Sequence, residues 1–253
     1  MIDAHAHLDD RRFSDDLDSV LARASAAGIE RVLSCAGDLA SSERSVLIAR
    51  RYPSVRIAVG VHPHHAESWS DAVSGMVNRL ARDQHVVAIG EIGIDLSGRS
   101  APREAQEAAF LAQLALANVL VLPVVVHVRE AGPLARELID RAGGARGMVH
   151  CFSEGPDEVD EWMRRGFAVS FAGPVTYPKN DALRRAAARA SADRLLVETD
   201  APYLAPQARR GSRNEPAFVL ETLAAVAAAR GQEPEALGRQ IAENAQKLFG
   251  DRF

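Results

Sequence analysis

Residues 86–90 read Val-Val-Ala-Ile-Gly, and Glu91 follows them directly. An unbroken apolar run of this kind is typical of a parallel strand that is covered on both faces, because neither side of it meets water. A carboxylate that follows such a run needs a cation or hydrogen bonds to offset the cost of burying its charge. This stretch therefore predicts a buried parallel sheet with a polar site beside it.

Seven other short runs extend the pattern along the chain. Together, the candidate strands are Ile2–His5, Arg31–Cys35, Arg56–Gly60, Val86–Gly90, Val124–His127, Gly147–His150, Ala168–Phe171 and Leu195–Glu198. The stretches between them are rich in alanine, leucine and arginine. The clearest helical candidates there are Leu17–Ala27, Glu43–Arg51, Arg103–Asn118 and Pro156–Arg165. This alternation of strands and helices predicts an α/β fold with a parallel sheet.

Eight such units in about 250 residues match the usual size of a (β/α)8 TIM-type barrel, which is the predicted fold. An open, doubly wound sheet is the alternative, since periodicity alone does not separate the two. A dinucleotide-binding version of that sheet is disfavoured, because no Gly-x-Gly-x-x-Gly motif follows the first strand. No linker or low-complexity tract interrupts the chain, so residues 1–253 are expected to form a single domain.

The composition limits the environment and the partners. Two cysteines, Cys35 and Cys151, are too few for a disulfide framework and favour a reducing compartment. The sequence has no signal peptide and no apolar run of the ~18 residues that a membrane span needs, so we expect a cytoplasmic protein without membrane association. The formal net charge of -4 argues against a broad basic surface for nucleic acid, so any such substrate would be bound locally, at the site.

Imidazole and carboxylate side chains stand at the ends of five candidate strands. They are His5, His7, Glu91, His127, His150 and Asp200. His5 and His7 are two residues apart in an extended segment, so their rings point to the same side. The carboxyl ends of the strands of a barrel surround one mouth, and these residues should meet there. Imidazole and carboxylate bind zinc, manganese and similar divalent ions, so the pattern predicts a metal site.

Further polar side chains follow the third and sixth strands. His62 lies with His64 and His65 in a loop after the third strand, and we expect His62 to contact substrate or the metal ligands. Cys151 follows His150, but strand alternation predicts that its thiol points away from the mouth.

Two more residues are candidates for binding substrate. Arg129 lies two residues past His127, where a guanidinium could hold a phosphate in a bidentate fork; a structural salt bridge is the alternative. Tyr203 follows the last strand and could offer substrate a hydroxyl or a stacking face, or else pack against the turn at Pro202.

Several of these stretches match the motifs of a known family, in family order. They are Asp3–Leu8, Gly60–His64, Gly90–Asp95, Val126–Ala131, His150–Ser153, Glu198–Leu204 and Arg210–Pro216. The chain thereby resembles the TatD-type metal-dependent deoxyribonucleases, a branch of the amidohydrolase superfamily. The resemblance implies a barrel with one to three divalent ions, hydrolysis of phosphodiester bonds in DNA, and the ligand role for the six strand-end residues. One departure follows Asp95, where the family often has aromatic residues and this chain has Leu96 and Ser97.

Two divalent ions, of zinc, manganese or magnesium, are the expected cofactors. The two histidines of the first strand would hold one ion with Asp200, while His127 and His150 would hold the other. Glu91 could bridge both ions, since a carboxylate has two oxygens. A metal lowers the pKa of bound water from about 16 towards about 7. We assign Asp200 as the general base for that water, with a role as ligand alone as the alternative, and Glu91 as the second catalytic residue.

Three functions are compatible with these residues. The favoured one is a metal-dependent deoxyribonuclease that acts on single-stranded DNA or on 3′ ends. The alternative is a metal-dependent hydrolase of another small ester, phosphoester or aminoacyl ester, because the same metal ligands would serve substrates with different leaving groups. The third is a barrel that binds metal or a partner without catalysis. No obligate protein partner is evident from the sequence.

Overall fold

The computed structural model describes residues 1–98, 100–250 and 252–253. The strands are β1 Ile2–Ala6, β2 Arg31–Cys35, β3 Val55–Val59, β4 Val86–Asp95, β5 Val124–Arg129, β6 Gly147–Val149, β7 Ala168–Phe171 and β8 Leu195–Val197. The helices are α1 Leu17–Ala26, α2 Leu39–Arg51, α3 Asp71–Leu80, α4 Arg103–Leu120, α5 Gly132–Arg141, α6 Pro156–Arg164, α7 Asp181–Arg189, α8 Val219–Arg230 and α9 Pro234–Phe249. Among the helices described, none combines the length and the hydropathy that a bilayer span requires.

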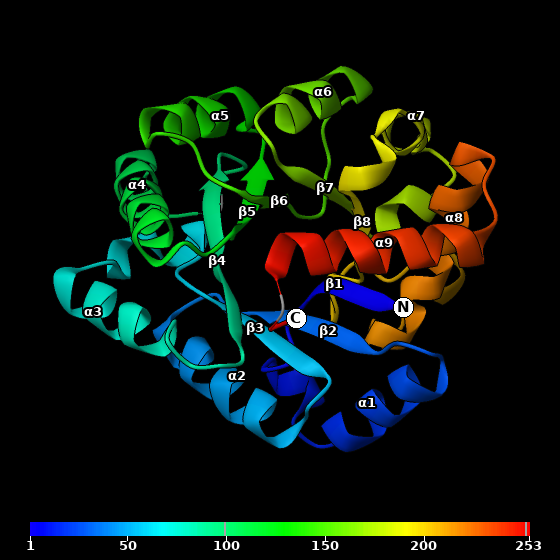
Figure 1. Cartoon of the computed structure of the whole chain (residues 1–253), viewed down its shortest axis with the longest axis horizontal. Coiled ribbons are helices and arrows are strands. Elements are labelled where there is room, and N and C mark those ends of the chain that lie inside the picture. The colour runs from blue at the N-terminus through cyan, green and yellow to red at the C-terminus, as the bar shows by residue number, and fades with distance from the viewer. Residues whose placement is uncertain (99, 251) are drawn as a thin grey trace.

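The predicted (β/α)8 barrel is confirmed. Within the described residues, eight strands form one sheet in the order β1 to β8, and every neighbouring pair is parallel. Helices α1 to α8 surround this sheet, as Figure 1 shows. A sequential order of this kind excludes the open, doubly wound alternative, in which the strand order reverses at a switch point.

The seam between the first and last strands is closed by backbone contacts. The amide of Asp200 donates to the carbonyl of His5 at 2.9 Å, and the amide of His7 donates to the carbonyl of Ala201 at 2.7 Å. A single parallel bridge joins Ala6 to Ala201. These contacts follow β8 rather than lying within it, so they draw the segment after β8 against the end of β1.

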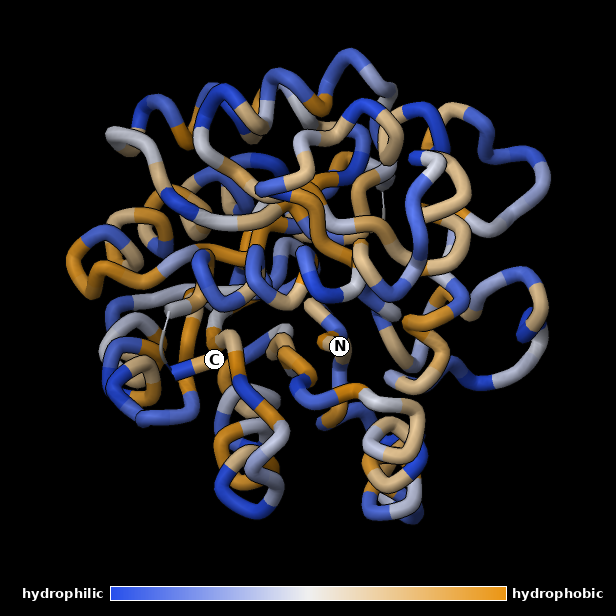
Figure 2. The backbone as a smooth tube through the Cα atoms, turned by 45° about the vertical axis from the view of Figure 1, so that its right-hand side comes forward, coloured by the Kyte–Doolittle hydropathy of each residue, from blue (hydrophilic) through white to orange (hydrophobic). Residues whose placement is uncertain are grey.

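The strands carry the core of the protein. All ten residues of β4 are buried, as are all residues of β1, β6, β7 and β8. Figure 2 shows hydrophobic residues gathered in the central strands and hydrophilic ones on the outer helices and loops. Helix α9 lies across the strands in Figure 1, and Asn244 on it donates to the carbonyls of Ala192 and Leu195 at the start of β8. Helix α9 therefore covers the end of the barrel opposite the mouth.

One strand boundary differs from the sequence prediction in a way that matters for the site. Strand β4 does not end at Gly90 but continues to Asp95, because residues 92–95 pair with residues 126–129 of β5. Gly93 makes this pairing possible: its φ is +146°, and a Cβ at this position would collide with the carbonyl oxygen of His127. Glu91 therefore lies inside a strand, and it is Asp95 that ends it.

Candidate metal centre

A pocket of about 680 Å³ opens where the strands end, a volume within the range of about 300–1,000 Å³ typical of ligand sites. Loops that follow different strands supply its walls. The polar residues that line it are His7, His62, His64, His65, Glu91, His127, Arg129, His150, Cys151, Ser153, Asp200 and Tyr203. Of the six residues predicted as ligands, five line the pocket, and His5 is buried directly against them.

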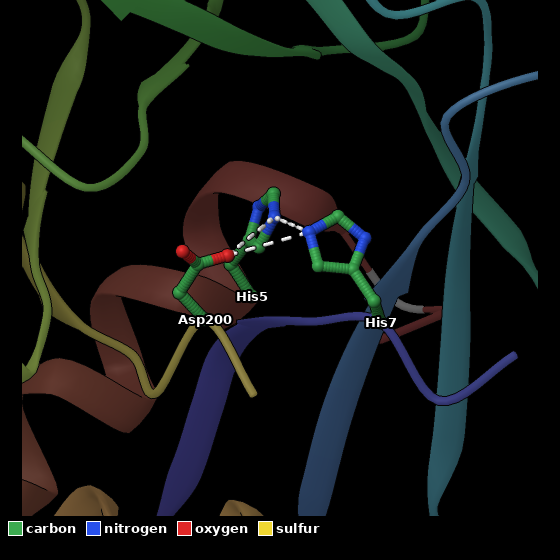
Figure 3. Close-up of side chains that lie close together, drawn as sticks. All are labelled: His5, His7 and Asp200. Atoms are coloured by element: carbon green, nitrogen blue, oxygen red, sulfur yellow. Dashed lines mark hydrogen bonds and ion pairs between the residues drawn. The ribbon is translucent and has the colours of Figure 1, made fainter. Parts of the chain in front are cut away.

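The first group of possible ligands joins both ends of the barrel sheet. The Nε2 atoms of His5 and His7 are 3.3 Å apart. Oδ1 of Asp200 is 3.3 Å from Nε2 of His7 and 3.7 Å from Nε2 of His5. Figure 3 shows the three side chains converging on one space. His5 reaches this space from β1 and His7 from the residue directly after β1, and the seam contacts bring Asp200 beside them.

Glu91 lies between this group and a second one. Its Oε2 atom is 3.3 Å from Nε2 of His5 and 3.6 Å from Nε2 of His7. Its Oε1 atom lies within 3.2 Å of a ring nitrogen on each of three further histidines. These are His62 at 3.2 Å, His127 at 3.0 Å and His150 at 2.8 Å. The two oxygens of one buried carboxylate thus point to two different sets of imidazoles.

The charges of these groups are strongly coupled. Burial raises the pKa of Glu91, but the surrounding histidines outweigh it and hold that pKa well below its usual value. Burial lowers the pKa of His7, yet the hydrogen bond that its ring donates to Asp200 and the charge of Glu91 raise it to about 9. The site therefore combines ionised acids with an imidazole, that of His7, which the acids favour in its protonated form.

The donor atoms fit a divalent cation. Neutral imidazole nitrogens are Lewis bases, and Nε2 of His5, Nε2 of His7 and Oδ1 of Asp200 all lie within 4.8 Å of one another. His62, Glu91 and His127 form another such set. In the part of the chain described, Oε2 of Glu91 and Nδ1 of His5 are buried without a hydrogen-bond partner. A buried oxygen of this kind has a lone pair to give to a cation.

A further layer of acceptors orients the histidine rings. Oδ2 of Asp95 is 3.2 Å from Nε2 of His127, and Oε1 of Glu198 is 3.2 Å from Nδ1 of His150. The carbonyl of Cys35 lies 2.9 Å from Nδ1 of His7. Metal-binding histidines usually engage their second nitrogen in this manner, which fixes the tautomer and the ring.

Asp95 and Glu198 are absent from the residues predicted from the sequence. Each directly follows an apolar residue at the end of a strand, at Ile94 and Val197. Glu91 and Asp200 are predicted from the same kind of apolar run. The pattern therefore indicates that Asp95 and Glu198 are buried acids, but it does not distinguish a possible metal ligand from an acid that orients a ligand.

The remaining predicted residues have different surroundings. His62 lines the pocket and also contacts Glu91, so it belongs to the second group of possible ligands. Arg129 is exposed at the end of β5, and within the described residues no carboxylate lies close enough to form the alternative salt bridge. Tyr203 is half exposed; its hydroxyl donates to Asp10, and the guanidinium of Arg12 lies 4.2 Å from its ring centre.

Cys151 contradicts its prediction, because it lines the pocket instead of pointing away. Strand β6 ends at Val149, so the alternation of a strand no longer applies two residues later. Cys151 also has a φ of +43°, which turns the chain at this point. Burial raises the pKa of its thiol well above the usual value, so the sulfur is held as a neutral thiol in this structure.

Parallel strands in a closed barrel, with histidines and carboxylates at their carboxyl ends, define the class of metal-dependent barrel hydrolases. The sequence profile of the family described as "TatD related DNase" matches residues 2–250. The chain belongs to this family, which confirms the resemblance found in the sequence.

Individual relatives agree over nearly the whole length. The chain is 39% identical to the "3'-5' ssDNA/RNA exonuclease TatD" of Klebsiella pneumoniae, covering 99% of this chain and 98% of the relative. It is 32% identical to "Uncharacterized metal-dependent hydrolase YabD" of Bacillus subtilis, covering 98% of each. The crystal structure of YjjV, a TatD homologue from Escherichia coli, superposes with a TM-score of 0.93 at 29% identity, covering 98% of this chain and 97% of that one.

Proposed function

We propose that this chain is a divalent-metal-dependent deoxyribonuclease that removes nucleotides from the ends of single-stranded DNA, with residues 1–253 acting as one domain. The observation that carries the proposal is the position of Glu91, whose two oxygens face two sets of histidines. Membership of the TatD related DNase family supports it, and so does the similarity to a relative named for its action on single-stranded DNA and RNA.

Two ions of zinc, manganese or magnesium would be held by the two groups. His5, His7 and Asp200 would bind one, as their converging donor atoms suggest. His127 and His150 would bind the other, since their facing nitrogens, Nδ1 and Nε2, are 3.2 Å apart. Glu91 would give one oxygen to each group. His62, also in the second group, lies 3.2 Å from Oε1 of Glu91 and would face both that ion and the substrate in the pocket.

When bound, such cations supply Lewis acidity and lower the pKa of coordinated water towards about 7. Asp200 acts as the general base in this proposal. Burial raises its pKa, but the hydrogen bond and charge of His7 outweigh this and lower it, so its carboxylate is ionised and able to accept a proton at neutral pH. Arg129, exposed on the pocket wall, would bind a phosphate oxygen of the substrate. Tyr203 would contact the substrate at the rim.

The test uses protein purified without chelator and single-stranded DNA labelled at either the 5′ or the 3′ end. With magnesium, manganese or zinc, we expect stepwise loss of nucleotides from one end, and no cleavage after chelation. His127→Ala should abolish cleavage. His85→Ala is the matched control, because His85 precedes β4 and pairs with Asp83 away from the pocket.

The opposite result would be the absence of DNA cleavage with every metal, together with turnover of a small ester or phosphoester. That result would replace the nuclease by the alternative hydrolase. Cleavage of DNA that persists in His127→Ala would show that the activity does not come from this site.

A further inference from the structure

A second hollow of about 410 Å³ lies beside the metal-ligand pocket. It is lined by Tyr177, Pro178, Lys179, Asn180 and Arg210. The first four residues connect the short helix Gly173–Thr176, which follows β7, to helix α7. Arg210 comes from the loop after β8. Both segments follow the carboxyl ends of strands, so this hollow opens on the same side of the barrel as the metal-ligand pocket.

The two hollows share a wall. Pro174 and Leu204 line the metal-ligand pocket. Nδ2 of Asn180, in the second hollow, donates to the carbonyl of Pro174 at 2.9 Å. The hydroxyl of Tyr177 donates to the carbonyl of Ala205, the residue after Leu204, also at 2.9 Å. A flexible chain that leaves the first pocket over this wall therefore enters the second.

The charges in the second hollow are not neutralised by neighbouring acids. Arg210 and Lys179 are exposed, and within the described residues neither has a carboxylate within 4.0 Å. Other arginines of the same loop are paired: Arg209 lies 2.7 Å from Glu221, and Arg213 lies 2.7 Å from Asp16. Two free cations on a chain with a net charge of -4 mark a local site for an anion.

The hollow also offers an aromatic surface. The guanidinium carbon of Arg210 lies 4.7 Å from the ring centre of Tyr177, in a cation–π arrangement. Proteins that bind single strands combine cations for the phosphates with aromatic and arginine planes on which bases stack. On the other side of the pocket, after Asp95, the chain has Leu96 and Ser97 and no aromatic ring.

We propose that Tyr177, Lys179 and Arg210 form a subsite for those nucleotides of a single-stranded polynucleotide that lie beyond the metal-ligand pocket. The inference rests on the proposed nuclease function and extends it. The pocket holds the end that is cut, and the following phosphates run over the wall at Pro174 to Lys179 and Arg210, with a base stacked at Tyr177. Binding at this subsite depends on the length of the substrate rather than on its base sequence, because every base has a face that can stack on an aromatic ring.

A binding experiment measures the subsite directly. The metal-loaded protein is titrated with a nuclease-resistant, phosphorothioate-linked oligothymidylate of about 12 nucleotides at several salt concentrations. Each phosphate contact to a single strand contributes about 0.7 to the slope of log K against log salt. Lys179→Gln and Arg210→Gln should each reduce the slope by about 0.7, and the double variant by about 1.4. Arg209→Gln is the matched control and should leave the slope unchanged.

A kinetic experiment tests the dependence on length. On a long oligonucleotide, we expect the double variant to lose about 10-fold or more in kcat/KM, mainly through KM. On a dinucleotide, which ends inside the pocket, the change should stay within about 2-fold. Because both side chains are exposed, the substitutions should not disturb folding, which thermal unfolding of each variant checks.

The outcomes separate the subsite from the nuclease function. If the wild-type protein cleaves DNA but the double variant matches Arg209→Gln in slope and in kcat/KM, the subsite is wrong and the function stands. If the double variant loses the same factor on the dinucleotide, the residues act on the pocket itself and the subsite is again wrong. If the wild-type protein cleaves no nucleic acid, the function fails, and the salt slope alone decides whether the hollow binds a single strand.

Discussion

The contact between Asp95 and His127 gives a sharp test of how the second ligand group is built. His127 presents Nδ1 to Glu91 at 3.0 Å and Nε2 to Asp95 at 3.2 Å, so its ring is fixed from both sides. Burial raises the pKa of Asp95, but hydrogen bonds from His127 and Ser97 outweigh it and keep the acid ionised. Asp95→Asn removes that charge and keeps the shape, whereas Asp95→Ala removes both.

The size of the effect follows from this geometry. Loss of an acceptor that orients a metal-binding histidine typically costs 10- to 100-fold in metal affinity, which corresponds to about 1.4–2.7 kcal/mol. In Asp95→Asn the amide oxygen can still accept the hydrogen bond of His127, so we expect a loss of about 10-fold. In Asp95→Ala the ring can also turn, so we expect about 100-fold.

The assay is calorimetric titration of chelator-stripped protein with zinc or manganese, with separate fits for the tighter and the weaker ion. Asp83→Asn is the matched control, since Asp83 lies 2.8 Å from His85 in a similar pair before β4. Affinities for both ions that stay at the wild-type values in Asp95→Ala would refute the reasoning. An equal loss for both ions would show that Asp95 stabilises the whole site rather than His127.

Four other predictions follow from the same structure. Asp200→Asn should keep a bound ion but lower the rate of DNA cleavage by about 10²- to 10⁴-fold; rates near the wild-type value would exclude the role of general base. Chelation should lower the melting temperature by about 5 °C. An ion present at 100 times its Kd adds about 2.7 kcal/mol to the free energy of unfolding, and the entropy of unfolding of this chain is roughly 0.5 kcal/mol/K. Scanning calorimetry with and without chelator measures the shift, and an unchanged melting temperature would contradict the prediction. The raised pKa of His7, about 9, means that the metal-free protein keeps a proton there at pH 7, so metal affinity should rise with pH up to about pH 9. Calorimetry in buffers of different ionisation enthalpy should show about one proton released per ion at this group at pH 7, and a value of zero would contradict the protonated state. Gly93→Ala should destabilise the protein by about 3 kcal/mol in urea unfolding, because its Cβ meets the carbonyl of His127; Gly28→Ala, also at positive φ but with open space around it, should cost only about 1 kcal/mol.

Much of the fold can be predicted from the sequence because each barrel strand is a local signal. Runs such as Val86–Gly90 and Val124–His127 are apolar over their whole length, and a strand covered on both faces requires that. The six predicted ligands also meet, because the barrel brings the ends of its strands to one mouth. Strand ends are harder to predict, since the extension of β4 to Asp95 depends on pairing with β5, which is distant in sequence.

The finer division of roles within the site could not be predicted for a related reason. Glu91, Asp95 and Glu198 all follow apolar runs. Only the three-dimensional distances show that Glu91 faces both groups of histidines, while Asp95 contacts His127 and His64 and Glu198 contacts His150. His62 could not be separated from a substrate contact, because its approach to Glu91 depends on the path of a loop. The inward position of Cys151 depends on one backbone angle, and no periodic pattern records such an angle.

The seam between β1 and β8 gives the first ligand group an unusual dependence on the chain as a whole. His5 lies in the first strand and Asp200 follows the last strand, yet both belong to one group of donor atoms. A cation bound there would link the first strand of the barrel to the segment after the last one. It could bind to all three residues only after translation has passed residue 200. Metal content at this group would consequently report whether the segments that carry His5 and Asp200 have met, so a product truncated before residue 200 should be recognisable by its failure to retain the ion.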